Sequence, residues 1–208
     1  GLGYCQVNVS NFVCGELGTD NLFKFNITDY SGSQIFNTFN TSNGVGPNLS
    51  LPNVTIEYAL GNESSVNRTG SNTAFLALRV YDSDKGAYVT DGVNTTIWVT
   101  TAGGLVYDNG ANGTTNATGH FNRSFEPTGG YDAARQNWTG GVFDSCYYNT
   151  NASLFNVSVI GDLRSNVTVP VPETEFLRGS SNVSITTNVT DDCGLPVTGA
   201  TVNFTSIK

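Results

Sequence analysis

The chain has 208 residues, a formal net charge of −8 and only 12% charged residues, about half the usual share. The acidic balance argues against a nucleic acid partner, because phosphate binding relies on lysine and arginine. No run of 18 apolar residues occurs, so the sequence predicts no membrane span. With one histidine, His120, and no C-x-x-C pair, neither a zinc site nor a nucleophilic catalytic centre is expected. We therefore expect no cofactor, no metal and no enzymatic activity.

Asparagine lies unusually often in the glycosylation context N-x-S/T. Eighteen of the 25 asparagines do so, whereas chance would place about 5 there. The excess predicts an extracellular or cell-surface chain that carries dense N-linked glycans. The chain contains no methionine, so we expect a processed product whose signal peptide or anchor lies outside it. The predicted glycosylation sites are Asn8, Asn26, Asn40, Asn48, Asn53, Asn62, Asn67, Asn94, Asn112, Asn116, Asn122, Asn137, Asn151, Asn156, Asn166, Asn182, Asn188 and Asn203.

Short stretches of period-2 alternation dominate the chain, and clusters of Gly, Asn, Asp and Ser separate them. This pattern is typical of an all-β sandwich. In chain order the predicted strands are 5–13, 22–28, 53–60, 73–82, 94–101, 120–125, 153–160, 165–171, 182–190 and 200–206.

In ten of the eighteen glycosylation triplets the middle residue is large and apolar. Residues i and i+2 of a strand share one face and residue i+1 takes the other. Each such triplet is therefore expected to point Asn and Ser/Thr at solvent and its middle side chain at the core. The ten residues are Val9, Ile27, Leu49, Val54, Trp138, Val157, Val167, Val183, Val189 and Phe204.

The four cysteines are Cys5, Cys14, Cys146 and Cys193. An even number in an extracellular chain indicates disulfides, and three connectivities are possible. Sequence proximity favours Cys5–Cys14, which leaves Cys146–Cys193. The second bond would tie two domains together.

An internal repeat is visible at an offset of 108, where Asp84–Thr90 aligns with Asp192–Thr198. The segment Cys193–Phe204, with Pro196-Val197-Thr198-Gly199-Ala200, resembles the start of bacterial and archaeal immunoglobulin-like repeats of the invasin and intimin type. Asn116–Phe121 is similar to a later turn and strand of those domains. The resemblance implies immunoglobulin-like sandwiches in tandem. It divides the chain into a β segment at 1–52, a sandwich at 53–172 and the start of a second sandwich at 173–208.

The second copy of the repeat, at 173–208, has residues for only a few strands of a sandwich. A partial sandwich of this kind would expose an apolar face and an unpaired strand edge. Either a longer chain completes it, or a neighbouring subunit donates strands, for which residues 1–52 are a candidate. Glycosylated archaeal threads are filaments of that kind, and the chain resembles their subunits. We therefore expect a structural subunit of an extracellular filament or surface layer, with identical subunits and its own glycans as partners. The alternative is an adhesin or ligand-binding ectodomain that uses the repeats as a stalk.

Three further features admit a functional and a structural interpretation. His120 alternates along a predicted strand, which favours a surface position over catalysis. The acidic clusters at 82–84, with Asp91, and at 191–192 offer carboxylates to calcium, but aspartate is also a common turn residue. Trp98 alternates with Ile97 and Val99, so it is expected to face solvent, a glycan or a neighbouring subunit.

Overall fold

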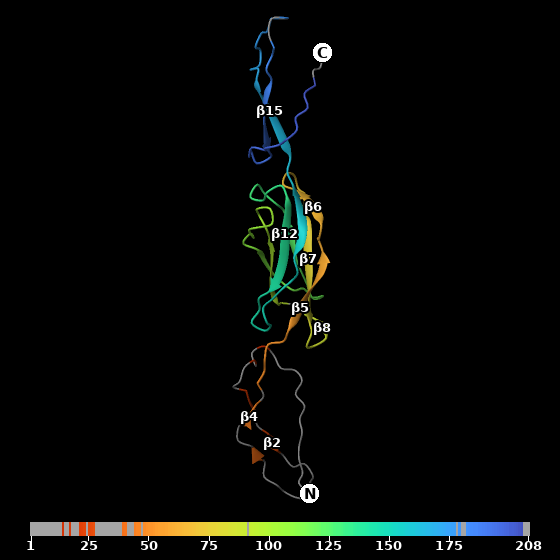
Figure 1. Ribbon diagram of the computed structural model, residues 1–208. Helices are drawn as coiled ribbons and strands as arrows, with labels where there is room; N and C mark the ends of the chain where they lie inside the picture. Colours follow the sequence, from red (N-terminus) through yellow and green to blue (C-terminus); the bar gives the residue numbers. More distant parts are fainter. Residues whose placement is uncertain are drawn as a thin grey trace.

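The computed structural model describes residues 14, 17, 21–23, 25–27, 39–40, 44–46, 48–90, 92–177, 179 and 182–205, with backbone only for 26–27 and 39–40. Within these ranges the regular elements are strands, and none is an α-helix. No helix there is long and apolar enough to cross a membrane. Figure 1 shows an elongated arrangement, with a β-sandwich in the middle and a slender unit projecting from one end.

The central sandwich consists of two facing sheets, so the fold is all-β and a sandwich, as predicted. The large sheet has the order β10-β9-β12-β14-β6, with β13 beside β12; the small sheet has the order β11-β7-β5, with β8 beside β7. The β14–β6 pair is parallel and the other pairs are antiparallel. The bounds are β5 Val54–Leu60, β6 Ser64–Asn67, β7 Ala74–Asp82, β8 Ala87–Tyr88, β9 Asn94–Val99, β10 Ala111–Thr114, β11 His120–Phe125, β12 Arg135–Val142, β13 Thr150–Asn151 and β14 Phe155–Ile160.

The core lies between these sheets and follows the period of two. Leu76, Leu78 and Val80 alternate along β7 and are fully buried. Trp138 and Val157, from the facing sheet, belong to the same apolar cluster. Burial of side chains of this size stabilises a fold by about 1.5–3 kcal/mol each, so these residues account for the cohesion of the two sheets.

Four strands of the large sheet were not predicted, namely β6, β10, β12 and β13. Strand β12 is central, although Gly140 and Gly141 made its sequence resemble a turn. A Cβ atom added at Gly140 would lie 2.6 Å from Leu78 Cδ1, so the glycine admits a side chain of the small sheet. Conversely, predicted strand 200–206 is wrong over residues 201–205, which form no strand, and predicted strand 5–13 lies outside the described residues.

The projecting unit is a single layer built from β15, Leu163–Val169, and β16, Thr186–Asp191. They pair antiparallel, and a bridge from Thr190 to Pro196 adds a short third segment. The domain boundary predicted at residue 172 is therefore wrong, because β15 pairs with β16 and with neither sheet of the sandwich. We call residues 163–205 the C-terminal unit.

The described part of the N-terminal segment contains two small antiparallel pairs. Strand β1, Leu22–Phe23, pairs with β4, Gly44–Val45, and β2, Asn26–Ile27, pairs with β3, Phe39–Asn40. The predicted strand 22–28 is thus divided between β1 and β2. These pairs lie at the end of the sandwich opposite the C-terminal unit (Figure 1).

Candidate functional site: the glycosylation faces and the open C-terminal unit

The predicted glycosylation sites whose side chains the structure describes lie at or near the surface. Side chains are described for 15 of the 18 asparagines, and none of these 15 is buried. Attachment of a glycan requires an accessible carboxamide, so the surface position satisfies the first physical requirement of the prediction. The exposed asparagines are Asn48, Asn53, Asn62, Asn94, Asn112, Asn116, Asn122, Asn151, Asn166, Asn182, Asn188 and Asn203; Asn67, Asn137 and Asn156 are half-buried. Asn8 lies outside the described residues, as do the side chains of Asn26 and Asn40.

The asparagine carboxamides differ in whether the side-chain nitrogen, to which an N-linked glycan is attached, already donates a hydrogen bond. Asn116 Oδ1 accepts hydrogen bonds from the backbone of Thr118 and His120 and from the Thr118 hydroxyl, at 2.8–3.0 Å. This turn uses the oxygen of Asn116 and leaves its nitrogen available. Asn137 is the opposite case, because its Nδ2 donates to the Gly104 carbonyl at 3.2 Å. Asn137 is therefore the least suited of this pair to carry a glycan in the folded chain.

In the sandwich, large apolar middle residues of glycosylation triplets point into the core, as expected from the alternation of side chains along a strand; we call this the triplet rule. Val54, Trp138 and Val157 each occupy the middle of a glycosylation triplet, and all three are buried in the core. The preceding asparagines lie at the surface or half-buried. In the sandwich, one triplet therefore specifies both a core contact and a surface asparagine.

The same rule identifies two arginines that were missed in the sequence. Arg68 and Arg123 are the middle residues of triplets that begin at Asn67 and Asn122, so the period of two points both of them inward. Arg123 binds Asp108 at 2.7 Å, and both side chains are largely buried. Burial alone would raise the pKa of Asp108, but hydrogen bonds from Arg123 and Tyr131 lower it below its ordinary value. Arg123 on β11 is thus joined by an ion pair to Asp108, which lies between β9 and β10, so the pair connects the two sheets.

Arg68 joins the sandwich to the C-terminal unit. Its Nη2 lies 2.9 Å from Asp191 Oδ2 and 2.5 Å from Asp192 Oδ1, and its Nη1 donates to the Tyr131 carbonyl at 2.9 Å. The guanidinium thus spans the end of β6, the sandwich loop at Tyr131 and the turn that follows β16. The hydrogen bond from Arg68 is the main cause that lowers the pKa of Asp191. Burial opposes the charge of Arg68, but the two carboxylates raise its pKa above the ordinary value.

The C-terminal unit repeats part of the small sheet of the sandwich. In the sandwich, β5 pairs with β7 and β7 pairs with β8; in the C-terminal unit, β15 pairs with β16 and Thr190 bridges to Pro196. Both hairpins turn at a glycine with positive φ, Gly86 at 68° and Gly194 at 80°. The repeat seen in the sequence is therefore a strand, a turn and a short returning segment, which in the sandwich are β7, the turn at Gly86 and β8.

The aspartates of these turns act as turn residues. Asp82 Oδ1 accepts the backbone N–H groups of Asp84 and Lys85 at 3.0 and 2.9 Å. Asp191 Oδ1 accepts those of Cys193 and Leu195 at 2.9 and 2.8 Å. The carboxylates thus have protein donors, which accounts for the acidic clusters by turn chemistry. Asp91 lies outside the described residues.

The apolar face of the C-terminal unit is uncovered. Residues that lie opposite each other on paired strands share a face of the sheet. Val189 lies opposite Ser165, which is on the same face of β15 as Leu163 and Val167. Leu163, Val167 and Val189 therefore lie on one face, where Thr187 is opposite Val167. Val167 is 57% exposed, whereas Val157 in the sandwich is fully buried. Val183 and Phe204, predicted to face a core, are exposed as well, the latter at 68%. No second sheet covers this face within the described residues.

The disulfide pairing predicted from sequence proximity is wrong. Cys14 pairs with Cys146, with their Cα atoms 5.2 Å apart, and Cys193 is free and exposed. Strand β12 separates Cys146 from the sandwich end where Cys193 lies beside Gly129, and its eight residues span about 24 Å. A disulfide needs Cα atoms within about 7 Å, so Cys146 cannot reach Cys193. Cys5 lies outside the described residues.

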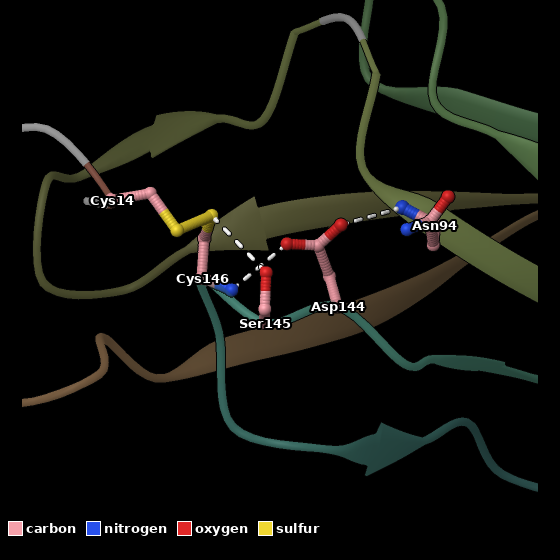
Figure 2. The surroundings of a disulfide bond; sticks show 5 residues. All are labelled: Cys14, Asn94, Asp144, Ser145 and Cys146. Atoms are coloured by element: carbon pink, nitrogen blue, oxygen red, sulfur yellow. Dashed lines mark hydrogen bonds between the residues drawn. A yellow bond between two sulfur atoms is a disulfide. The ribbon is translucent and has the colours of Figure 1, made fainter. Parts of the chain in front are cut away.

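Figure 2 shows how the disulfide is seated at the N-terminal end of the sandwich. Asp144 Oδ1 accepts the backbone N–H of Cys146 at 2.9 Å, and its Oδ2 accepts that of Asn94 at 3.1 Å. The loop that carries Cys146 is thereby fixed to the start of β9. The disulfide ties residue 14 of the N-terminal segment to this fixed loop.

The remaining candidates are placed as surface residues. His120 is half-buried at the start of β11, with Nδ1 2.9 Å from the Thr118 hydroxyl. Trp98 is half-buried, and it packs against Phe143 with ring centroids 5.4 Å apart. Its neighbours Ile97 and Val99 are buried, so Trp98 lies on the outer face of the large sheet, as predicted.

No known protein family and no curated protein matches the chain. Among solved structures, the chain is similar to the CARDB domain of a Pyrococcus furiosus protein, solved in complex with di-metal ions. The identity is 13% and the TM-score 0.32, over 55% of this chain and 98% of that domain.

Proposed function

We propose that the chain is a structural subunit of a heavily N-glycosylated extracellular filament or surface layer, assembled end to end from identical copies. The observation that carries the proposal is the uncovered apolar face of the C-terminal unit. Leu163, Val167 and Val189 gather on a layer whose strand pairing matches that of β5, β7 and β8 in the small sheet. An exposed face of this kind is the usual mark of a protein–protein interface.

The occupant we propose for this face is an extended segment from residues 1–52 of another copy. The described N-terminal strands and the C-terminal unit lie at opposite ends of the sandwich (Figure 1). A contact between the N-terminal end of one copy and the C-terminal end of the next is head-to-tail, and such contacts generate filaments when they do not close into rings. Strand addition would provide both a sheet partner and apolar side chains.

The asparagine distribution supports the coat. Exposed glycosylation triplets occur on β10, β11 and β15, and therefore on both sheets of the sandwich and on the C-terminal unit. Glycans at these positions would cover outer strand faces and hinder edge pairing with wrong partners. With only 12% charged residues, the chain depends on another source of solubility, and glycans supply it.

The test is self-assembly of the glycosylated chain, followed by electron microscopy and light scattering. Val167→Asp places a charge on the uncovered face and is expected to abolish fibres while leaving the unfolding temperature unchanged. Arg164→Asp is the matched control, because Arg164 lies on the opposite face of the same strand. Fibres from Val167→Asp at wild-type yield would sink the proposal. A monodisperse wild-type glycoprotein that binds a defined ligand would favour the adhesin alternative.

A further inference from the structure

A hollow on the outer face of the large sheet is walled by aromatic rings. Its lining includes Trp98, Tyr107, Phe143 and Leu154, and its volume is about 530 Å³. The Trp98 and Phe143 rings meet edge to face at 88°. Tyr107 is 42% exposed and Phe143 41%, although both are large apolar rings. These rings lie outside the core cluster, so core packing does not account for them.

Two glycines hold the rings close to the sheet. A Cβ atom at Gly110 would lie 2.6 Å from Trp98 Nε1, and one at Gly141 would lie 2.5 Å from Phe143 Cε2. Any side chain at either glycine would displace a ring from the backbone. We call the Trp98 and Phe143 rings the Trp98–Phe143 platform. The platform depends on glycine at two positions, Gly141 on strand β12 and Gly110 beside strand β10.

The predicted glycosylation site Asn151 forms part of the same hollow. Asn151 pairs with Gly141 across β12 and β13, and it is exposed. A Cβ at Gly141 would lie 2.5 Å from Asn151 Oδ1, so the carboxamide and the Phe143 ring share the space above one glycine. Ala152, the middle residue of this triplet, also lines the hollow. A sugar attached to Asn151 would therefore start beside the Phe143 ring.

We propose that the first sugars of an N-glycan on Asn151 pack against the Trp98–Phe143 platform. Sugar rings carry C–H faces that suit aromatic surfaces, and carbohydrate sites combine such surfaces with a few polar groups. The polar residues that line this hollow are Asn151, Thr139, whose hydroxyl donates to the Ala152 carbonyl, and Asp108, which binds Arg123. Covalent attachment makes the contact intramolecular, so a weak interaction is enough to populate it. The glycan would thereby cover the exposed aromatic patch. This inference rests on the proposed glycosylation.

The test uses tryptophan fluorescence with iodide as the quencher. The chain has two tryptophans, and Trp138 is fully buried, so quenchable emission reports Trp98. Asn151→Gln and Ser153→Ala both remove the site, and Ser153→Ala keeps the asparagine side chain. Each is expected to raise the quenching constant about two-fold in the dispersed glycoprotein. Asn122→Gln, on the small sheet, is the matched control and is expected to leave it unchanged. Trp98→Phe should remove the quenchable emission.

Glycopeptide mass spectrometry separates this inference from the glycan coat itself. A bare Asn151 beside occupied sites elsewhere overturns the platform contact and leaves the coat standing, whereas bare asparagines throughout overturn both. An occupied Asn151 with unchanged quenching in Asn151→Gln overturns the contact. If Asn94→Gln or Asn112→Gln abolishes the shielding of Trp98 from iodide, the platform binds another glycan, and the proposed contact is overturned. If Trp98 is shielded only after assembly, a neighbouring copy covers the platform, and the contact is likewise overturned.

Discussion

The sandwich and the C-terminal unit carry the same triplet, and it has different consequences in each. Val157 and Val167 are both the middle residue of an N-V-S/T triplet on a strand. Val157 is fully buried, whereas Val167 is 57% exposed. Both valines lie on strands, and a second sheet faces Val157 whereas none of the described residues forms a sheet over Val167. A triplet specifies which face of a strand is apolar, and a facing layer decides whether that face is buried.

The two regions also differ in how apolar the corresponding face is. The two hairpins align by their hydrogen bonds, because the Val89 N–H donates to the Val80 carbonyl and the Val197 N–H to the Val189 carbonyl. Val189 thus takes the position of Val80, and Thr187 that of Leu78, one residue away from the alignment of the sequence repeat. Val80 and Leu78 are fully buried, while Thr187 and Val189 are half-buried. A threonine in place of a leucine reduces the cost of exposing the face to water. The C-terminal unit is thus suited to an exposed state before it meets a partner.

The largest expected effect contrasts two middle residues. Trp138→Ala keeps the glycosylation triplet but removes a fully buried ring, and it should lower the free energy of unfolding by about 3–5 kcal/mol. Val167→Ala in the dispersed chain should change it by less than about 0.5 kcal/mol. Denaturant unfolding measures both. Similar losses for the two variants would contradict the distinction between the regions.

The disulfide affects the opposite end of the sandwich. It joins residues 132 apart, and replacing Cys14 and Cys146 by serine should cost about 2–5 kcal/mol, because the unfolded chain regains the entropy of that loop. Cys193→Ser is the control, and it should change the free energy of unfolding by less than about 0.5 kcal/mol. Thermal unfolding without reductant provides the measurement. If Cys193→Ser proved as destabilising as the double variant, the pairing described here would be wrong.

Gly140 tests how closely the two sheets of the sandwich approach. Its added Cβ would lie 2.6 Å from Leu78 Cδ1 and 3.0 Å from Phe121 Cε2. Gly140→Ala should therefore destabilise the chain by about 1–3 kcal/mol through overpacking. Gly113→Ala, where the nearest atom would be 3.9 Å away, should be nearly neutral in the same unfolding experiment. A neutral Gly140→Ala would show that the facing sheet can yield at this point.

The Arg68 junction controls how firmly the C-terminal unit is held. Arg68→Gln removes a charge that two carboxylates share, so the junction should open more often. We expect proteolysis between residues 160 and 163 to accelerate on the order of ten-fold, with the sandwich itself remaining folded. Arg135→Gln breaks an exposed ion pair with Glu63 and is the control. Equal cleavage of both variants would show that Arg68 does not hold the junction.

The smallest effect is a pH dependence of the same junction. Asp191 has its pKa lowered from 3.8, mainly by Arg68. A lowered folded pKa contributes stability above the ordinary carboxyl range, and that stability is lost as the pH falls through the lowered value. Cleavage at the junction, read with an acid-active protease, should be constant above about pH 5 and should rise below about pH 4. In Arg68→Gln the increase in cleavage at low pH should be smaller. An unchanged pH profile in this variant would show that groups other than the Arg68–Asp191 pair cause the increase.

Much of the sandwich could be predicted from alternation alone. Strands β5, β7, β9, β11 and β14 lie within or close to predicted ranges, because each alternates clearly between core and surface. Strand β12 could not be found this way. Gly140 makes room for Leu78 and Phe121, residues distant in sequence, and that need is visible only after the sheets are placed.

The long-range pairings were equally inaccessible to local reasoning. Proximity in sequence suggested Cys5–Cys14, but the structure brings Cys14 to Cys146 across the sandwich end. The Arg68 junction depends on Asp191 and Asp192, more than 120 residues away. One signal was present and overlooked, since Arg68 is the middle residue of a triplet and the alternation rule already pointed it inward.

The central claim is that another copy covers the apolar face of the C-terminal unit. A cryo-EM map of the native assembly tests it most directly. We expect an extended segment from residues 1–52 of a neighbouring copy against Leu163, Val167 and Val189, with glycan density at the exposed asparagines around it. A map in which this face is bare, or is covered by the chain's own residues, would show that no other copy covers it.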